Sequence, residues 1–290
     1  MDKVFKQKLI HWNNRTKTAT NKKLLGEEPL SISIEGKPYA VVMRTPGDEF
    51  AHVAGFCLTE GIIDTPDDLT SIGFCEDDDS NVVTLTLTPA RRKQIPEIMD
   101  RRGFISQTSC GICGKELVEE LYQIIKPVPD DPLLDSSKAC ACLENLTAQQ
   151  SLRRQTKASH AAVLYNAHYE LLSVAEDVGR HNALDKLIGW AFLNKKLPFH
   201  HQIIMVSGRA SFELLQKCLF AGAPIFCAVL RIMRWCLVFS ASILLKHLPL
   251  NSCGVILVSR LKRASSPSAQ GYLASFSSMF VAIVAGLNVS

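Results

Sequence analysis

Residues 202–215 read Gln202-Ile203-Ile204-Met205-Val206-Ser207-Gly208-Arg209-Ala210-Ser211-Phe212-Glu213-Leu214-Leu215. The unbroken apolar run over 203–206 predicts a strand that is buried on both faces, since a half-exposed strand would alternate apolar and polar residues. The Ser, Gly and Arg residues that follow predict a turn over 207–211, and the apolar residues from 212 predict a helix. A buried strand, a polar turn and a helix in this order indicate an α/β fold.

The turn over 207–211 is a candidate anion site. The first turn of a helix has free backbone N–H groups, and Arg209 adds a cation that can form two parallel hydrogen bonds to a phosphate. The alternative is that Ser207 and Gly208 form only a tight turn.

A similar order of elements precedes this unit. Strands are predicted over 161–165 and 169–174, and a helix with one apolar face over 183–192. Between them lies Glu176-Asp177-Val178-Gly179-Arg180-His181-Asn182, so charged side chains collect at a second helix start. Two alternatives stay open, namely that Arg180 only pairs with Asp177 or Asp185 at the surface, and that His181 has no chemical role.

The first hundred residues predict a smaller, β-rich portion. Residues 1–28 are polar and basic and predict a loose arm. Alternating apolar positions predict a β-hairpin over 30–43, a helix follows over 50–60, and β-branched residues predict a strand over 82–88. The α/β units therefore follow a separate group of strands.

A further stretch carries candidate nucleophiles, Thr108-Ser109-Cys110-Gly111-Ile112-Cys113-Gly114. Apolar residues at helical spacing predict an amphipathic helix over 115–125, and the dipole at its start favours the thiolate form of both cysteines. Three alternatives stay open: half of a structural zinc site, a thioredoxin-like redox pair, and chance. Cys140 and Cys142 would supply two more zinc ligands, but no turn residues surround them, and they are expected to be ordinary buried cysteines.

Composition sets broad limits. With 290 residues, 47% of them hydrophobic, the chain can bury one large core or two small ones. The ten cysteines are scattered, and no apolar signal segment follows Met1, so a reducing cytoplasm is the expected location. Residues 1–228 hold all 28 acidic and 26 of the 32 basic residues, a net charge of −2, which argues against nucleic-acid binding by this part.

Three motifs resemble the FdhD family, the sulfur carriers that serve the maturation of formate dehydrogenase. They are Thr108–Gly114, Glu176–Lys186 and Ser207–Glu213. The segments 55–61 and 159–162 also fit, so the resemblance runs in order over residues 28–228.

The resemblance implies a cytidine-deaminase-like α/β fold, with a mixed sheet and flanking helices, without the catalytic zinc of that fold and usually as a homodimer. It implies that sulfur is taken as a persulfide from a cysteine desulfurase and handed to the molybdenum or tungsten bis(molybdopterin guanine dinucleotide) cofactor before insertion into formate dehydrogenase. By motif position, Cys110 is expected to carry the persulfide and Cys113 to assist. The cofactor is then a bound substrate, and no permanently bound metal is expected. We infer that its pyrophosphates contact Arg180, His181, Ser207, Gly208 and Arg209.

After Val229 the sequence departs from the family pattern. The family continues with a Ser-Ala turn, a helix and a late strand with a Gly-Phe pair, whereas residues 229–290 hold six basic residues, no acidic residue and eleven serines. The expected organisation is an arm over 1–28, a β/α portion over 29–105, a persulfide loop and α/β core over 106–228, and an aberrant tail over 229–290. The uncharged segment 271–289 nearly has the length of a membrane span, but its serines and glycines make a weak insertion signal, so an anchor is not expected.

Two other functions stay open. A zinc-dependent nucleoside or base deaminase on the related fold is disfavoured, because the full ligand pattern of His-x-Glu with Pro-Cys-x-x-Cys is absent. A cofactor-binding chaperone whose thiols transfer nothing would keep its binding after loss of Cys110.

We predict that a frameshift near the codon for Val229 generates the tail. Resequencing the gene should reveal a second reading frame that restores the turn, the helix and the Gly-Phe strand. A verified sequence in which no frame restores them would contradict this prediction.

Overall fold

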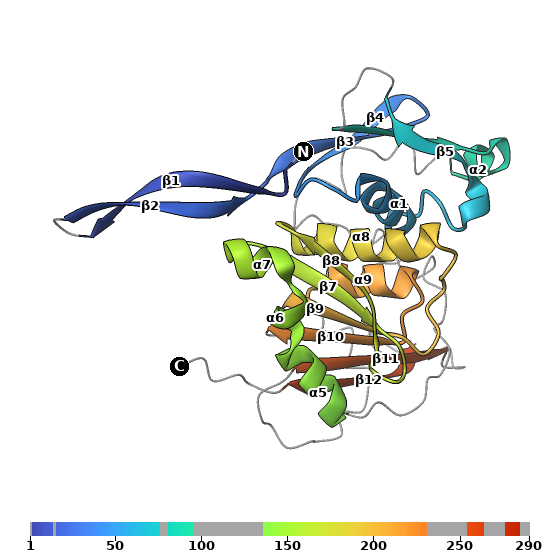
Figure 1. Cartoon of the computed structure of the whole chain (residues 1–290). Coiled ribbons are helices and arrows are strands. Elements are labelled where there is room, and N and C mark those ends of the chain that lie inside the picture. The colour runs from blue at the N-terminus through green and yellow to red at the C-terminus, as the bar shows by residue number, and fades with distance from the viewer. Residues whose placement is uncertain are drawn as a thin grey trace, which may run out of the picture.

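A six-stranded sheet forms the centre of the computed structural model, which describes residues 2–13, 16–75, 81–95, 136–230, 254–263 and 276–284. Its strand order is β12-β11-β10-β9-β7-β8 (Figure 1). β9 and β10 run parallel and the other neighbours antiparallel, so the sheet is mixed. The strands are β7 (His160–Tyr165), β8 (Leu171–Asp177), β9 (Ile203–Arg209), β10 (Ile225–Leu230), β11 (Gly254–Arg263) and β12 (Phe276–Val284).

Helices cover both faces of this sheet. Ile204 and Val206 of β9 join the core on the face of α8 and α9, and Ile203 and Met205 join the core under α5 and α6. Successive side chains of a strand point to opposite faces, so all four residues are buried, as the apolar run predicted. The helices are α5 (Ser136–Glu144), α6 (Leu146–Gln149), α7 (Ser151–Thr156), α8 (Arg180–Leu193) and α9 (Phe212–Phe220).

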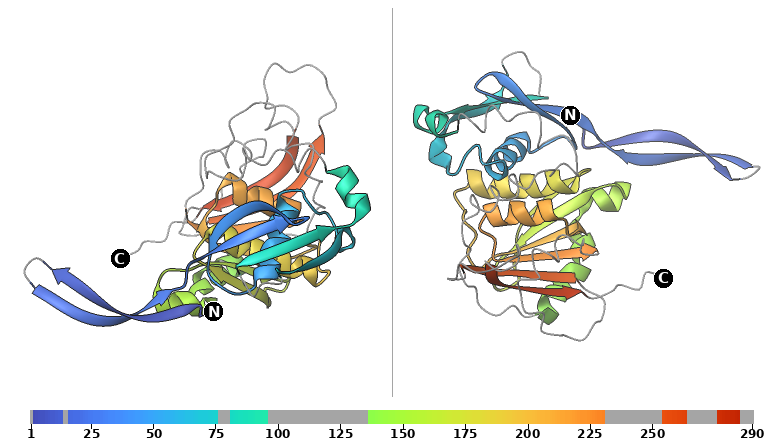
Figure 2. Two further views of the ribbon diagram at one scale, coloured as in Figure 1. Left: turned by 90° about the horizontal axis from the view of Figure 1, so that it is seen from above. Right: turned by 180° about the vertical axis from the view of Figure 1, so that it is seen from behind.

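A second, four-stranded sheet lies on the far side of α8. Its order is β4-β3-β6-β5, and α1 lies between this sheet and α8 (Figures 1 and 2). Apolar residues of β3, β6, α1, α8 and α9 share one buried cluster, so the two sheets enclose a common core. The elements are β3 (Glu28–Ile34), β4 (Lys37–Arg44), α1 (Glu49–Thr59), η1 (Pro66–Asp68), β5 (Leu69–Phe74), β6 (Val82–Leu87) and α2 (Pro89–Gln94).

α1 and α8 approach each other to backbone contact at two glycines. A Cβ atom on Gly55 would lie 1.9 Å from the carbonyl oxygen of Asp185, and one on Gly189 would lie 1.7 Å from that of Ala51. Real Cβ contacts are never this short, so the two helices can lie at this distance only while both positions are glycine. The contact joins the four-stranded sheet to the larger one.

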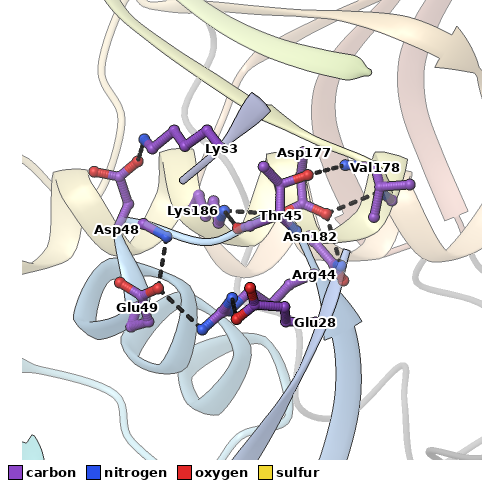
Figure 3. A network of polar contacts seen from close by, with 12 residues as sticks. Lys3, Glu28, Arg44, Thr45, Asp48, Glu49, Asp177, Val178, Asn182 and Lys186 are labelled. Carbon is purple, nitrogen blue, oxygen red and sulfur yellow. Dashed lines mark hydrogen bonds and ion pairs between the residues drawn. The ribbon is translucent and has the colours of Figure 1, made fainter. Parts of the chain in front are cut away.

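A buried polar network crosses the same boundary (Figure 3). Thr45 uses all its polar groups there: its N–H donates to Asp177 Oδ2 (3.0 Å), its hydroxyl accepts from the N–H of Val178 (3.0 Å), and its carbonyl accepts from Lys186 Nζ (2.7 Å). Lys186 also pairs with Asp177 at 2.8 Å. The turn after β4 is thus bonded to the junction between β8 and α8.

Arg44, the residue before Thr45, is a second buried cation, and its partners belong to the smaller unit formed by β3–β6 and α1. Its guanidinium lies 3.1 Å from Glu49, 3.5 Å from Glu28 and 2.9 Å from the amide oxygen of Asn81. These partners come from α1, from β3 and from the residue before β6, so Arg44 fixes three parts of the smaller unit around one charge.

Most predicted elements are confirmed. The mixed α/β sheet with flanking helices and the smaller β-rich portion are present, and the predicted hairpin over 30–43 corresponds to β3 and β4. The turn predicted to begin at Ser207 begins later, because β9 continues through Arg209. The hydroxyl of Ser207 accepts the N–H of Ala161 in β7 at 2.8 Å, which extends the strand pairing over this residue. The boundary expected near residue 105 lies outside the described residues.

The prediction of a loose arm over residues 1–28 is wrong. β1 (Val4–Asn13) and β2 (Thr16–Leu25) pair antiparallel along their whole length and project from the body as a two-stranded ribbon (Figures 1 and 2). Almost every side chain of the ribbon is exposed. With neither face buried, its sequence shows no alternation from which strands could be predicted.

The tail adds two strands to the six-stranded sheet. β11 pairs antiparallel with β10, and β12 pairs with β11. Part of the uncharged segment 271–289 thus forms β12. Among the described helices, none combines the length and the apolar character needed to cross a membrane.

We predict that Gly189→Ala lowers the free energy of unfolding by about 3 kcal/mol, because the added methyl group must push α1 and α8 apart. Gly73→Ala is the matched control, since a Cβ atom there meets no atom within 4 Å. Urea denaturation followed by circular dichroism measures both. Equal stability of the two variants would contradict the close helix contact.

Candidate functional site

The candidate site lies at one edge of the six-stranded sheet. β8 and β9 both end at this edge, and β7, which is antiparallel to each, begins there. α8 starts directly after β8 and α9 starts soon after β9, so the N-termini of two helices meet at the edge (Figure 1). Free backbone N–H groups and the positive ends of two helix dipoles favour an anion at such a place.

Positively charged side chains surround His160, the first residue of β7. Burial lowers the pKa of His160, and the nearby charges of Arg180, Arg153, His181 and Arg209 lower it further. These residues come from α8, α7 and β9, so the sheet pairing gathers cations that are distant in the sequence.

Two buried nitrogen atoms at this edge have no hydrogen-bond partner within the described part of the chain. They are Nδ1 of His160 and Nε of Arg180. An unpaired buried polar atom costs free energy, which an acceptor-rich ligand would recover. Nε of Arg180 is a charged donor, and neither atom is bonded to a carboxylate, so together with the surrounding arginines they suit the oxygens of a phosphate or pyrophosphate.

Gly208 shapes the position of Arg180. A Cβ atom on Gly208 would lie 3.1 Å from Cδ and 3.3 Å from Cβ of Arg180. The side chain of Arg180 therefore lies across the bare backbone of β9. Gly208 acts as packing surface for the arginine, whereas Arg209 is exposed beside it.

His181 is held by α9. Its Nε2 lies 3.0 Å from Glu213 Oε2 and 3.5 Å from the hydroxyl of Ser211, the N-cap residue of α9. His181 and Glu213 thus link the first turns of the two helices.

One helical turn further along α8 and α9, a buried ion pair also joins these two helices. Lys217 Nζ lies 2.9 Å from Asp185 Oδ1 and 2.8 Å from the hydroxyl of Thr59. Burial alone would lower the pKa of Lys217, but the charges of Asp185 and Glu60 outweigh it and raise that pKa, so the lysine stays charged. The pair fixes α8, α9 and α1 relative to one another behind the site.

The structure brings together the five predicted contact residues, Arg180, His181, Ser207, Gly208 and Arg209. The open alternative that Arg180 pairs with Asp177 or Asp185 does not hold among the described residues, because these acids pair with Lys186 and Lys217. Ser207 contributes mainly to the strand pairing with Ala161.

Sequence reasoning missed two residues of the site, the cation Arg153 and the imidazole of His160. His160 had appeared only as part of a short segment that resembles the family, and Arg153 belongs to a short helix with no motif. Arg153 is positioned by its Nη1 donating to the carbonyl of Ser159 at 3.0 Å, and by its backbone N–H donating to Glu176 at 2.9 Å. Arg153 and His160 lie beside Arg180 only because β7 is placed between β8 and β9 in the sheet.

The predicted nucleophiles Cys110 and Cys113 lie outside the described residues. Of the described thiols, Cys57, Cys218 and Cys227 are buried, and burial raises the pKa of Cys57 and Cys218 well above the usual range of cysteine. Cys140 and Cys142 are half-buried in α5 beside the core, and Cys75 is exposed. Over the described ranges, no group of three or more His, Cys, Asp or Glu side chains is placed to hold a metal ion.

Comparison with known proteins gives consistent matches. The model of the FdhD/NarQ family matches residues 25–237. A protein of Streptomyces coelicolor named sulfur carrier protein FdhD is 42% identical over 215 residues, which cover 71% of this chain and 76% of that protein. A protein of the same name from Mycolicibacterium paratuberculosis is 38% identical over 235 residues, 79% of this chain and 86% of that protein.

The fold also has a match among solved structures. A candidate formate dehydrogenase accessory protein from Desulfotalea psychrophila superposes with a TM-score of 0.65 at 19% sequence identity, over 89% of this chain and 93% of that one. At this identity the match supports the fold alone.

We predict that Arg180→Gln weakens the binding of pyrophosphate about tenfold or more, because a charge-assisted hydrogen bond contributes about 1.5–3 kcal/mol. Lys195→Gln is the control, since it removes the same charge just beyond the opposite end of α8 and should leave the affinity unchanged. Isothermal titration calorimetry at constant salt measures both. If pyrophosphate binds both variants equally, the cationic edge is not its site.

Proposed function

The chain belongs to the FdhD/NarQ family, and from this premise we propose that it carries sulfur for the maturation of a formate dehydrogenase. The observation that carries the proposal is the extent of the family match, which includes the Cys110 and Cys113 motif and all residues of the cationic edge. The names of the two bacterial relatives support the same role.

We propose that sulfur is loaded by thiol exchange. The thiolate of Cys110 attacks the outer sulfur of a persulfide on a cysteine desulfurase. The S–S bond of the donor breaks, the desulfurase cysteine leaves as a thiolate, and Cys110 becomes the persulfide. A lowered thiol pKa at the start of a helix favours this attack.

Release of the sulfur requires a second thiol. The thiolate of Cys113 attacks the inner sulfur of the Cys110 persulfide, which forms a disulfide between the two cysteines and expels hydrosulfide for the metal of the acceptor. The transferred sulfur is reduced by two electrons and the two cysteines are oxidised, so a thiol reductant must restore them before the next cycle.

The proposed acceptor is the molybdenum or tungsten bis(molybdopterin guanine dinucleotide) cofactor, bound as a substrate. Each half of this molecule contains a pyrophosphate. Arg180, His181 and Arg209, with His160 and Arg153, offer the positive charge and free donors that such groups require. The proposal includes a reducing cytoplasm, a homodimer, and passage of the cofactor to formate dehydrogenase.

Within this proposal, the buried thiols of the core have no part in transfer. Burial keeps Cys57 and Cys218 protonated and inaccessible to a donor protein, whereas a carrier must expose a thiolate. Cys75 is exposed and provides an internal control for nonspecific sulfur uptake.

We predict that incubation with a cysteine desulfurase and cysteine adds the mass of one sulfur atom to the protein. Cys110→Ala should abolish this gain in mass, because the thiol on which the persulfide forms is gone. Cys113→Ala should retain it, because only release is impaired. Cys75→Ala should load normally. Intact-mass spectrometry under non-reducing conditions measures all four proteins.

Loading that is unchanged in Cys110→Ala would refute the carrier role of this cysteine. Pyrophosphate binding without any sulfur gain, in protein shown to be folded by circular dichroism, would instead favour a chaperone that binds the cofactor and transfers nothing.

A further inference from the structure

Glu176 is an acidic residue beside the cationic edge, and the proposed function gives it no role. It lies near the end of β8, directly opposite Ala161 of β7, and is half-buried. Ala161 follows His160, so the carboxylate is close to the residues that would hold a polyanion. An acid at such a place repels an anion unless the protein uses its charge in another way.

The carboxylate of Glu176 accepts four hydrogen bonds. Oε1 accepts from the N–H of Leu152 at 2.8 Å and from the hydroxyl of Ser151 at 3.1 Å. Oε2 accepts from the N–H of Arg153 at 2.9 Å and from the hydroxyl of Ser159 at 2.7 Å. An ionised carboxylate offers about four lone-pair sites. These contacts therefore use the full acceptor capacity of the side chain.

Two of the four donors are backbone N–H groups in the first turn of α7. The N-cap residue of this helix, Gln150, forms no side-chain bond that caps it. Glu176 caps the helix instead, from a strand that lies 23 and 24 residues further along the chain than the two N–H groups. Its negative charge also suits the positive end of the helix dipole. The carboxylate thus fixes the start of α7 against the end of β8.

Both contacts that hold Arg153 depend on Glu176. The backbone N–H of Arg153 donates to the carboxylate, and its Nη1 donates to the carbonyl of Ser159 at 3.0 Å. The hydroxyl of Ser159 in turn donates to the same carboxylate, and this serine is completely buried. The next residue is His160, whose Nδ1 is one of the two unpaired atoms of the edge. One acid therefore sets the positions of an arginine and an imidazole.

Glu176 has two opposite effects on a polyanion at the edge. Its negative charge repels the ligand, whereas its hydrogen bonds keep the guanidinium of Arg153 near His160. Four donors direct the positive ends of their dipoles at the carboxylate, which offsets much of the repulsion. The placement of the cation is then the larger effect.

We propose that Glu176 is a positioning residue of the polyanion site, which holds Arg153 and His160 in place for the ligand without touching the ligand itself. The inference rests on the pyrophosphate binding of the proposed function and is independent of its sulfur chemistry. It also separates the roles of two adjacent acids, because Asp177 holds Thr45 and Lys186 on the other side of β8.

The test is the sign of the change in pyrophosphate affinity of the full chain carrying Glu176→Gln. Glutamine has nearly the same size, but its amide group cannot accept from all four donors. Loss of the negative charge alone would strengthen binding, whereas displacement of Arg153 and His160 should weaken it about tenfold. Glu170→Gln is the matched control, because it removes the same charge before the other end of β8 and should leave the affinity unchanged. Isothermal titration calorimetry measures the affinities, and circular dichroism verifies folding.

A double-mutant cycle separates positioning from general damage to the structure. In an Arg153→Gln background, Glu176→Gln should weaken binding by at most about threefold more, because the arginine that it places is already gone. In an Arg209→Gln background it should again weaken binding about tenfold. Unchanged or tighter binding by Glu176→Gln, or an equal further loss in both backgrounds, would overturn the proposal.

A second variant covers the case in which Glu176→Gln does not fold. Ser159→Ala removes a single donor and keeps the acid and its contacts with α7, and it should weaken pyrophosphate binding about threefold. Equal affinity of Ser159→Ala and the wild type would then overturn the proposal.

Two further readouts distinguish failure of the inference from failure of the proposed function. Hydrogen exchange at the N–H of Arg153, which Glu176 protects, should be faster in Glu176→Gln than in the wild type, with no ligand present. Equal exchange rates would overturn the positioning contact itself. A wild type that binds no pyrophosphate would instead refute the binding site of the proposed function and, with it, this role. Sulfur loading of the wild type is measured separately and tests only the carrier chemistry.

Discussion

The distance between α1 and α8 is the constraint on which the rest of the structure depends. At Gly55 and Gly189 the two backbones leave no room for even one methyl group. This close approach brings the turn after β4 against the junction of β8 and α8, where Thr45 bonds to Asp177, Val178 and Lys186. A wider separation would break these bonds together, because hydrogen bonds weaken steeply with distance. The helix contact thus determines where the first turn of α8, and with it Arg180, is held.

Buried cations then fix the relative orientation of the helices and strands that they join. Arg44, Lys186 and Lys217 are each buried, and each pairs with an acid from another element of the chain. The cost of burying charges largely cancels the attraction within such pairs, but loss of one partner costs about 3–5 kcal/mol. The main effect of these buried ion pairs is therefore to exclude other relative orientations of the helices and strands that they join. Lys217 and Asp185 lie one helical turn behind Glu213 and His181, so the same α8–α9 contact that is fixed in the core also places His181 at the sheet edge.

The sequence predicts this fold where burial leaves a pattern. The apolar run over 203–206 predicts a strand covered on both faces, and the sequence motifs single out Arg180, His181, Gly208 and Arg209, which the structure brings together. The ribbon was missed because neither face is buried, and no alternation results. His160 and Arg153 were missed because strand order alone unites them with Arg180. The role of Gly189 was missed because a glycine inside a helix gives no sign of what it contacts.

The composition of the cationic edge is a reason to place the proposed ligand binding and the proposed sulfur carriage in separate segments. The charges of Arg153, Arg180 and Arg209 repel one another, and they also disfavour protonation of His160. A ligand with several negative charges relieves this repulsion at several points at once, and a neutral molecule relieves none of it. The edge is therefore suited to holding a polyanion. A nucleophile has different requirements, namely exposure and a lowered thiol pKa, and the buried thiols Cys57 and Cys218 of the neighbouring helices have neither. The packing that fixes the cations buries these thiols, which is why the proposed function places the carrier thiol outside the packed core.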